Sequence, residues 1–489
     1  MSEHKSRGAA AAGAGAAPRE RAGLLWAPRA WVGNRWCERV VLEAGADGAW
    51  LRVEAGQPPP AGATVLAGPA LPGLVNAHSH AFQRAFAGLA ERRQVNQDDF
   101  WSWRDSMYRI AGRVSVAQQK AIAAQLYVEL LRGGFTHTCE FHYLHHAPDA
   151  AGGAREASGT PRAMAQAIAA AAGETGMGLT LLPAVYERAG FAQPGLRDDQ
   201  RRFAADAAAV LRLRDELRAD AAVGAGEGPK VRVGIALHSL RAATPAAIER
   251  LQAGSDDAPI HIHVAEQLQE VDDCLEATGL RPIDWLCRNA SLDRRWQLVH
   301  ATHATAAEIE AVARSGAGVV LCPSTEANLG DGIADLPAWL KHGVPLSLGS
   351  DSNVTRSALE ELRLLEYSQR LARRVRCVAA APQEFETSTA ERLWSRVLRG
   401  GAAAAGFSAW GLQVGARADL LVVDTAAPAL LGIAPSHTLD AMVFSSPNRP
   451  LRDVLVAGRW VTREHRTPGA AAIAARFTDA MQELWADAS

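Results

Sequence analysis

The chain has 489 residues, of which 48% are apolar and 21% are charged, and its formal net charge is −2. This length and apolar content predict a large core, such as a barrel with an accessory unit. The near-neutral charge argues against a nucleic-acid partner and against a polybasic membrane patch. The six cysteines are scattered without a CxxC pair, which is typical of free thiols in a reducing compartment and indicates a cytoplasmic protein.

The amino-acid composition of the chain changes near residue 23. Residues 1–22 are rich in Ala and Gly, and we interpret them as a disordered tail, because an export signal needs a more strongly apolar run. No run of about 18 strongly apolar residues follows, so no membrane span is expected. Residues 23–70 carry short strand and turn signals, including Gly33-Asn34 between aromatic and β-branched residues, which indicates a hairpin.

Alternating strands and helices are expected over residues 71–406. The helices are amphipathic or capped, as at 117–132 and at the Thr305–Glu308 capping box. The expected strands cover 71–77, 135–141, 178–184, 230–237, 259–263, 296–300, 318–322 and 344–349. Eight parallel strands with helical crossovers predict an α/β fold, a closed (β/α)8 TIM-like barrel. An open doubly wound sheet is the alternative, but no G-x-G-x-x-G motif follows a suitable strand.

Strand signals return after a helical segment at 389–406. The stretch 411–424 alternates around a turn at 416–417, and Val443-Phe444 and 453–461 add further strands. We expect residues 407–470 to join 23–70 in a small discontinuous β-sandwich domain, with the barrel of 71–406 inserted between them. Residues 471–489 are expected to form a C-terminal helix. Inside the barrel region, one long helix is predicted over 198–220.

Polar side chains stand at the ends of several predicted barrel strands. The first strand ends in His78-Ser79-His80, and positions i and i+2 of a strand share a face, so both imidazoles can reach one cation. The C-terminal ends of barrel strands face a common pocket. The other strand ends carry Glu140, His142, Tyr143, His238, Arg241, His263, Glu266, His300, His303 and Asp351. Histidines and carboxylates at four strand ends predict a catalytic metal site.

The ligand set can be narrowed by coordination chemistry. His78, His80, His263 and Asp351 supply four ligands and leave a position for water, which suits zinc, although iron(II) or manganese(II) also accepts this donor set. Lys230, the lysine of the fourth strand, stands at its start and cannot bridge a second metal. One metal ion per subunit is therefore expected.

His300 and Glu266, at two further strand ends, remain for proton transfer. His300 and Asp351 can orient an attacking water, and Glu266 can carry a proton to a leaving nitrogen, which together favour hydrolysis of a C–N bond. A solvated carboxylate at a helix start is the alternative for Glu266. We expect structural roles for the remaining candidates, His137, His145, His146, His261 and His303.

The series His78-x-His80, His263-x-x-Glu266, His300 and Ser350-Asp351 resembles the mononuclear deaminase branch of the amidohydrolase superfamily. Local stretches are similar to the formimidoylglutamate deiminases of that superfamily, namely 76–85, 100–104, 140–146, 238–241, 263–267 and 322–332. The resemblance covers about residues 23–480. It implies hydrolysis of N-formimidoyl-L-glutamate to N-formyl-L-glutamate and ammonia, a step of histidine degradation, by a single metal-bound hydroxide.

The same resemblance implies roles for individual residues, and it implies a homodimer. The implied zinc ligands are His78, His80, His263 and Asp351, and the implied acid/base is Glu266. The implied substrate contacts are Gln83, Arg104, Tyr143, His238, Arg241 and His300. Arg104 and Arg241 suit a small-molecule substrate with two carboxylates, because guanidinium binds carboxylate bidentately; surface ion pairs are the alternative.

Two other functions remain alternatives at this point. The same machinery could act on another substrate, such as guanine or another cyclic amidine. A non-catalytic relative that kept only the fold is the other alternative, but it predicts eroded ligands, whereas all four are present.

Overall fold

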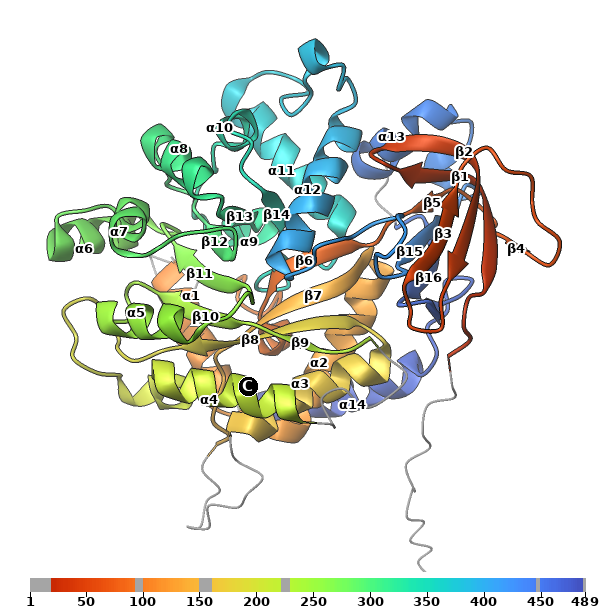
Figure 1. The fold of residues 1–489 in the computed structure, drawn as a ribbon. Helices are drawn as coiled ribbons and strands as arrows, with labels where there is room; N and C mark the ends of the chain where they lie inside the picture. Colours follow the sequence, from red (N-terminus) through yellow and green to blue (C-terminus); the bar gives the residue numbers. More distant parts are fainter. Residues whose placement is uncertain (1–18, 93–99, 149–160, 221–228, 446–448, 487–489) are drawn as a thin grey trace, which may run out of the picture.

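A computed structural model describes residues 19–92, 100–148, 161–220, 229–445 and 449–486. Most of the expected tail, residues 1–18, and the loop at 149–160 lie outside the described residues. A barrel surrounded by helices occupies most of the molecule, and a β-sheet built from the two ends of the chain packs beside it (Figure 1). In the part of the chain that is described, no helix has the length and apolarity needed to cross a membrane.

The barrel is a ring of parallel strands. In chain order these are β6 (Leu74–Ser79), β7 (Phe135–His142), β8 (Gly178–Val185), β9 (Arg232–Val233), β10 (Ile235–Ser239), β11 (Ile260–Val264), β12 (Trp296–His300), β13 (Gly318–Leu321) and β14 (Leu346–Leu348). β9 and β10 are two parts of one barrel position on either side of Gly234. Pairing runs from β10 through β14 to β6, β7 and β8, and β8 pairs with β10, which closes the ring. The expected (β/α)8 barrel is confirmed.

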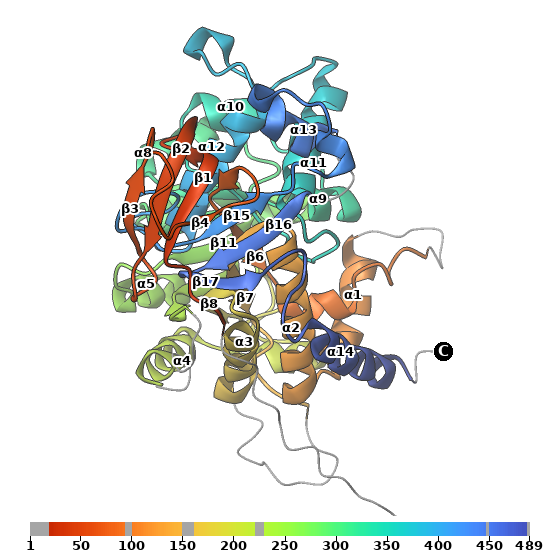
Figure 2. The same ribbon diagram turned by 90° about the vertical axis from the view of Figure 1, so that its right-hand side faces the viewer.

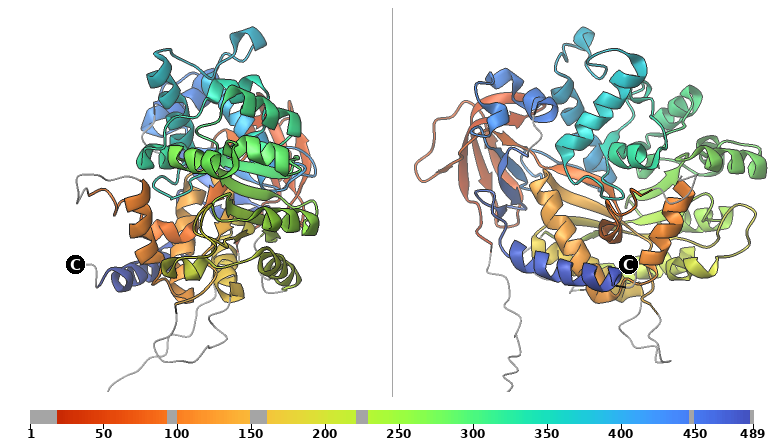
Figure 3. Two further views of the ribbon diagram at one scale, coloured as in Figure 1. Left: turned by 90° about the vertical axis from the view of Figure 1, so that its left-hand side faces the viewer. Right: turned by 180° about the vertical axis from the view of Figure 1, so that it is seen from behind.

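Helices cover the outside of this ring, as all three ribbon views show (Figures 1 to 3). They are α2 (Val116–Arg132), α3 (Pro161–Thr175), α4 (Ala207–Ala219), α5 (Pro245–Gly254), α6 (Leu268–Thr278), α7 (Pro282–Asn289), α8 (Ala306–Ser315), α9 (Pro323–Leu329), α10 (Leu336–Lys341), α11 (Ala358–Arg373) and α12 (Thr389–Ala404). The capping box predicted at Thr305 and Glu308 begins α8. Because helices cover them outside and side chains fill the ring inside, the barrel strands are almost entirely buried.

Two short helices follow β6 near the mouth of the barrel. They are η1 (Ala81–Ala85), a 3-10 helix, and α1 (Phe100–Ala111). A further helix, α14 (Ala470–Trp485), packs against α2 at the end of the described chain (Figure 3). A C-terminal helix was expected over 471–489; α14 ends at Trp485, and residues 487–489 lie outside the described residues.

Three details of the sequence prediction were wrong. The single helix expected over 198–220 is a 3-10 helix, η3 (Asp198–Phe203), followed by α4. The break arises because Ala205 pairs with Tyr186 and the Asp206 side chain accepts a hydrogen bond from the Ala209 N–H, which begins a new helix.

The other two errors concern strands. Val443-Phe444 belongs to α13 (Thr438–Phe444), because this short apolar run buries Leu439, Met442 and Val443 with helical spacing. Of the stretch 411–424, only β15 (Leu420–Val423) is a strand. The segment before it instead supplies single backbone hydrogen bonds, such as that from the Trp50 N–H to the Ala416 carbonyl.

The second sheet unites the two ends of the chain. Its strands are β1 (Leu24–Val32), β2 (Arg35–Ala44), β3 (Trp50–Glu54), β4 (Thr64–Val65), β5 (Ala70–Leu71), β15, β16 (Leu451–Val456) and β17 (Arg459–Thr462). They are hydrogen-bonded in the order β17-β16-β15-β5-β1-β2-β3, with β4 beside β1. The predicted hairpin at Gly33-Asn34 joins β1 and β2, and both residues have positive φ.

The apolar core of this sheet is formed by residues from both the first and the last part of the chain. Trp50 and Leu42 from the first part of the chain pack in one apolar cluster with Leu420, Leu455 and Trp460 from the last part. The structure has one continuous sheet here, in which residues from both parts of the chain share an apolar core.

Candidate active site

Donor atoms of His80, His263 and Asp351 meet around His78 at the C-terminal end of the barrel. A donor atom of His300 also lies within 4.8 Å of those of His78, His263 and Asp351. The Nε2 atom of His78 lies 3.2 Å from that of His80 and 2.9 Å from that of His263. Asp351 Oδ1 lies 3.2 Å from the Nε2 atoms of both His78 and His80. These separations are those of ligands around one small cation, because Zn–N and Zn–O bonds are about 2.0–2.2 Å long.

Backbone carbonyls fix which ring nitrogens face inward. His80 Nδ1 lies 2.9 Å from the Phe141 carbonyl oxygen, and His263 Nδ1 lies 2.7 Å from that of His238. A carbonyl oxygen only accepts hydrogen bonds, so each Nδ1 carries the hydrogen and each Nε2 presents a lone pair. Lone pairs that face one another within about 3 Å repel, and a shared cation turns this repulsion into attraction.

The charges of these groups also fit a cation. Burial lowers the pKa of His78 to about 3, and burial and the neighbouring imidazoles hold the pKa of His263 well below its usual range, so both rings are neutral. Burial opposes ionisation of Asp351, but the adjacent imidazoles of His78 and His80 keep its pKa well below the usual range. Neutral imidazoles and one carboxylate are the state in which these side chains bind divalent metals.

His300 and Glu266 lie beside this centre. His300 Nε2 is 3.5 Å from Glu266 Oε1 and 3.7 Å from Asp351 Oδ2, and its Nδ1 is 3.5 Å from Glu326 Oε1. Burial raises the pKa of Glu266 to about 6. Burial opposes protonation of His300, but Glu266 raises the pKa of His300 well above its usual range. A proton is therefore available between these two side chains, next to the expected metal ligands.

The backbone of the centre is strained and tightly braced. His300 and Asp351 adopt positive φ, which non-glycine residues rarely do. Asn353 braces this region: its Nδ2 donates to the carbonyl oxygens of His80 and Asp351, and its Oδ1 accepts from the Ser350 hydroxyl. Because Asn353 is fully buried, these bonds fix the loop that carries Asp351 against the loop after β6.

Three of the expected substrate contacts lie next to the imidazoles of the centre, on one side. Gln83, on η1, donates from Nε2 to the Tyr143 hydroxyl at 3.0 Å, and its Oε1 is buried without a protein partner among the described residues. The Tyr143 ring lies 4.9 Å from the His80 ring, and the His238 ring lies 5.0 Å from the His263 ring. The structure thus brings Gln83, Tyr143 and His238 to one side of the centre.

The two expected arginines lie together farther along the same side. The guanidinium carbon of Arg104 lies 4.4 Å and that of Arg241 lies 5.6 Å from the ring centre of Trp101. Stacking on an aromatic ring holds a guanidinium while leaving its N–H groups for ligands. The Nε atoms of both arginines are buried and lack a protein hydrogen-bond partner in the described part of the chain.

The structure adds residues that the sequence interpretation did not select. Glu326 approaches His300, and Asp331 lies with Glu266 and His300 in one group whose ligand atoms are within 4.8 Å of one another. Both come from the stretch 322–332, whose position directly after a barrel strand was the available signal. Trp101, Tyr108 and Tyr186 near the arginines had no comparable spacing signal, because they come together only in three dimensions.

Four of the five histidines expected to be structural are hydrogen-bonded away from the centre. His145 lies 2.8 Å from the Ala184 carbonyl oxygen, His146 lies 2.9 Å from that of Ala204, and His261 lies 2.8 Å from that of Ala404. His137 bonds to the Thr180 hydroxyl. His303 is half-buried beside the centre, and its backbone N–H donates to the Ala265 carbonyl.

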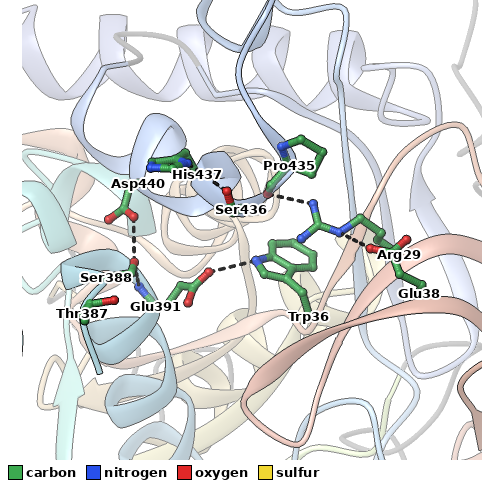
Figure 4. A pocket seen from close by; sticks show the side chains of 10 residues that line it. All are labelled: Arg29, Trp36, Glu38, Thr387, Ser388, Glu391, Pro435, Ser436, His437 and Asp440. Atoms are coloured by element: carbon green, nitrogen blue, oxygen red, sulfur yellow. Dashed lines mark hydrogen bonds and ion pairs between the residues drawn. The ribbon is translucent and has the colours of Figure 1, made fainter. Parts of the chain in front are cut away.

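A separate pocket lies where β1 and β2 approach α12 and α13 (Figure 4). Its polar side chains pair with one another: Arg29 with Glu38, the Trp36 indole N–H with Glu391, and the Ser388 hydroxyl with Asp440. These pairs satisfy much of the local charge, so the pocket lacks the convergent donors of the barrel mouth.

Fold and site together define a barrel hydrolase whose strand ends fit a divalent metal. The model of the amidohydrolase family matches residues 70–461, and the chain belongs to this family. The family resemblance inferred from the sequence is therefore confirmed.

Comparison with individual proteins shows which amidohydrolases the chain is similar to. The chain is 45% identical over 463 residues to the formimidoylglutamate deiminase of Pseudomonas aeruginosa, covering 94% of this chain and 99% of the relative. It is 31% identical over 408 residues to the 8-oxoguanine deaminase of the same species, covering 80% and 81% of the two chains. The crystal structure of an amidohydrolase from Brucella melitensis matches with a TM-score of 0.87 and 39% identity, covering 94% of this chain and 99% of that one. An adenosine deaminase from Xanthomonas campestris with bound zinc (TM-score 0.76, 22% identity, 96% and 100% covered) shares the fold.

Proposed function

We propose that this protein catalyses the hydrolysis of N-formimidoyl-L-glutamate, in which water and this substrate give N-formyl-L-glutamate and ammonia. The observation that carries the proposal is the pairing of a metal-fitting centre with two partly unpaired arginines on one side of the same barrel mouth. The formimidoylglutamate deiminase of P. aeruginosa, which matches nearly the whole chain, supports it.

The residues that would hold the metal are His78, His80, His263 and Asp351. A divalent ion bound there lowers the pKa of a coordinated water and so supplies a nucleophile at neutral pH. The ring orientations of His80 and His263, fixed by backbone carbonyls, keep their Nε2 lone pairs available for that ion.

His300, Asp351 and Glu266 would move the protons. His300 Nε2 and Asp351 Oδ2 lie 3.7 Å apart, so they can orient the attacking water from two sides. Glu266 holds a proton at a carboxyl oxygen more readily than an exposed glutamate, because burial raises its pKa. It can pass this proton to the nitrogen that leaves as ammonia.

The arginines would bind the two carboxylates of the substrate. Arg104 and Arg241 stack on Trp101 and keep N–H groups for bidentate bonds to carboxylate. Gln83 and Tyr143 lie nearer to the metal centre and can add neutral hydrogen bonds. An acyclic substrate with an amidine group at one end and two carboxylates fits this order of groups, whereas a purine would require stacking and amide contacts instead.

Zinc is the ion we propose, at one per subunit, because three imidazoles and a carboxylate are typical zinc ligands; iron(II) and manganese(II) also suit this set. Elemental analysis of the purified protein decides among the three. About one zinc per chain supports the proposal, and a content near zero after purification without chelator contradicts it.

The test of the activity is ammonia release from N-formimidoyl-L-glutamate by the metal-loaded protein, with guanine and cytosine as comparison substrates. Release from the first compound alone supports the proposal. Faster release from guanine or cytosine contradicts the substrate and favours a base deaminase. No release from any of the three by protein with one bound metal contradicts the substrate assignment as well.

The setting of the enzyme is part of the same proposal. We propose a cytoplasmic enzyme of histidine degradation, and the free cysteines support a reducing compartment. We also propose a homodimer, which light scattering on the purified protein tests directly.

A further inference from the structure

A chain of three buried polar side chains lies behind the two arginines. Gln200 Nε2 donates to the Tyr186 hydroxyl at 3.1 Å, and the Tyr186 and Tyr108 hydroxyl oxygens lie 3.0 Å apart. Gln200, Tyr186 and Tyr108 are 1%, 4% and 6% exposed, so bulk water does not compete for these bonds. Gln200 lies on η3, Tyr186 directly follows β8 and Tyr108 lies on α1, and the fold brings these elements together.

The orientation of the Gln200 amide is fixed. Its Oε1 accepts a hydrogen bond from the Arg197 backbone N–H at 3.0 Å. The NH2 group must therefore face Tyr186 and act as the donor there. The Tyr186 oxygen consequently receives a hydrogen bond and does not give one to Gln200.

A count of hydrogens follows from this orientation. Tyr186 and Tyr108 carry one hydroxyl hydrogen each, and only one of the two can lie in the bond between them. Within the described residues, no acceptor is found for the other hydrogen. A buried hydroxyl hydrogen without an acceptor is unfavourable, so the pair is arranged to donate to a group that is absent from the protein itself.

The surroundings indicate the charge of that group. The Arg104 guanidinium lies 5.5 Å from the Tyr108 ring centre, and Arg104 and Arg241 share the Trp101 ring. Acidic groups also face this region: Glu270 and Glu266 lie toward Arg241, and Asp105 is 3.9 Å from Arg104. The Nε atoms of both arginines still lack a protein partner in the described chain. Two cations and one spare hydroxyl donor together suit a carboxylate.

The position also suits a substrate that reaches the metal centre. The Tyr186 ring lies 4.5 Å from the His238 ring, which in turn lies 5.0 Å from that of the metal-site residue His263. The tyrosine pair is thus two ring contacts from the centre, a separation that a short acyclic chain spans.

We propose that the Tyr108–Tyr186 hydroxyl pair, ordered by Gln200, donates a hydrogen bond to one carboxylate of the substrate held by Arg104 and Arg241, and so determines selectivity for a dicarboxylate. This inference rests on the proposed function. It assigns a specificity-determining role to two tyrosines that take no part in the proton transfers.

The kinetic test compares Tyr108→Phe and Tyr186→Phe with wild type on three substrates. These are N-formimidoyl-L-glutamate and its analogues that lack one carboxylate, N-formimidoyl-4-aminobutyrate and N-formimidoyl-L-2-aminobutyrate. We expect kcat/KM for the dicarboxylate to fall about tenfold to a hundredfold, mainly through KM, since a hydrogen bond to a charged group is lost. The analogue lacking the contacted carboxylate should lose much less, so the selectivity ratio falls. Ratios that stay unchanged for both analogues overturn the inference.

The control is Tyr367→Phe on α11, which removes a hydroxyl bonded to the Phe444 carbonyl far from the barrel mouth. It should leave all three values of kcat/KM unchanged. Thermal unfolding of each variant identifies any loss of folding, and having two separate tyrosine variants keeps the test available if one of them does not fold.

A binding measurement separates this inference from the proposed reaction. Glutarate carries two carboxylates and no amidine, so calorimetric titration of glutarate does not depend on turnover. We expect wild type and Tyr367→Phe to bind it and both active-site variants to bind it about tenfold or more weakly. Wild type that fails to bind glutarate, or variants that bind it equally well, overturn the inference. Wild type that binds glutarate but releases no ammonia contradicts only the proposed reaction.

Discussion

At the proposed metal end of the site, His78 and His263 lie on barrel strands, His80 directly follows β6, and Asp351 lies three residues after the end of β14. Backbone carbonyls and Asn353 hold them there. At the carboxylate end, Arg104 lies on α1 and Arg241 in the turn after β10, and both are held by stacking on Trp101. In the proposed reaction, the donors fixed by the backbone would serve the chemistry, which tolerates little displacement, and the donors fixed by side-chain packing would serve recognition. Substitutions at the two ends should therefore have different kinetic signatures.

The largest effect is expected when a metal ligand is removed. His263→Ala should lower ammonia release about 10³-fold or more and leave substoichiometric metal, because the water-activating ion is lost with its ligand. Elemental analysis and an ammonia assay on the same sample measure both. The exposed His437→Ala is the control. Full metal content and activity in His263→Ala would remove His263 from the ligand set.

A smaller loss, still confined to the chemical step, is expected for Glu266→Gln. Amide has no acidic proton to give to the leaving nitrogen, so kcat should fall about 10²–10³-fold while KM changes little. Steady-state kinetics with metal content measured in parallel test this. The surface variant Glu310→Gln should behave as wild type, since its side chain is largely exposed. A rise in KM at normal kcat would instead place Glu266 at the recognition end.

At the carboxylate end, Arg241→Ala should raise KM more than it lowers kcat. Loss of charged hydrogen bonds of about 1.5–3 kcal/mol corresponds to a loss of roughly 10–100-fold in kcat/KM. Arg241→Lys should recover only part of this, because an ammonium group does not bind carboxylate bidentately. Arg314→Ala, which breaks an exposed pair with Glu310, is the matched control. Unchanged kinetics in Arg241→Ala would show that Arg241 does not belong to a substrate-recognition end of the site.

The smallest effect on turnover, but a measurable one on stability, is expected for Asn353→Ala. The substitution leaves the His80 and Asp351 carbonyls without their buried donor and places alanine at a φ of 61°. We expect the free energy of unfolding to fall by about 2–3 kcal/mol, and metal affinity about tenfold or more. Chemical denaturation and a metal-competition titration measure these quantities. Asn289→Ala, at an exposed helix end, serves as the reference.

The same contrast explains how much of the molecule could be predicted from its sequence. Barrel strands and their polar ends leave a repeating pattern, so the fold and the proposed metal ligands, from His78 to Asp351, could be selected from that pattern and from coordination chemistry. Helix 198–220 was misjudged because an Asp206 cap and the Ala205–Tyr186 pairing interrupt an otherwise helical run. The Trp101 stack and the Tyr108–Tyr186 pair could not be predicted, because their partners are far apart in the chain and meet only through tertiary packing.

The strands of the second sheet are synthesised at two separate times, at the beginning and near the end of translation of the nascent chain. β5 pairs on one side with β1, which precedes it in the same part of the chain, and on the other with β15, which follows the entire barrel. At synthesis rates of about 5–20 residues per second, β1 to β5 leave the ribosome roughly twenty to eighty seconds before their last partners. During that interval the apolar face around Trp50 and Leu42 has no cover from β15 to β17. Maturation of this unit is therefore set by translation time, and truncation just before β15 should yield a chain that depends on chaperones.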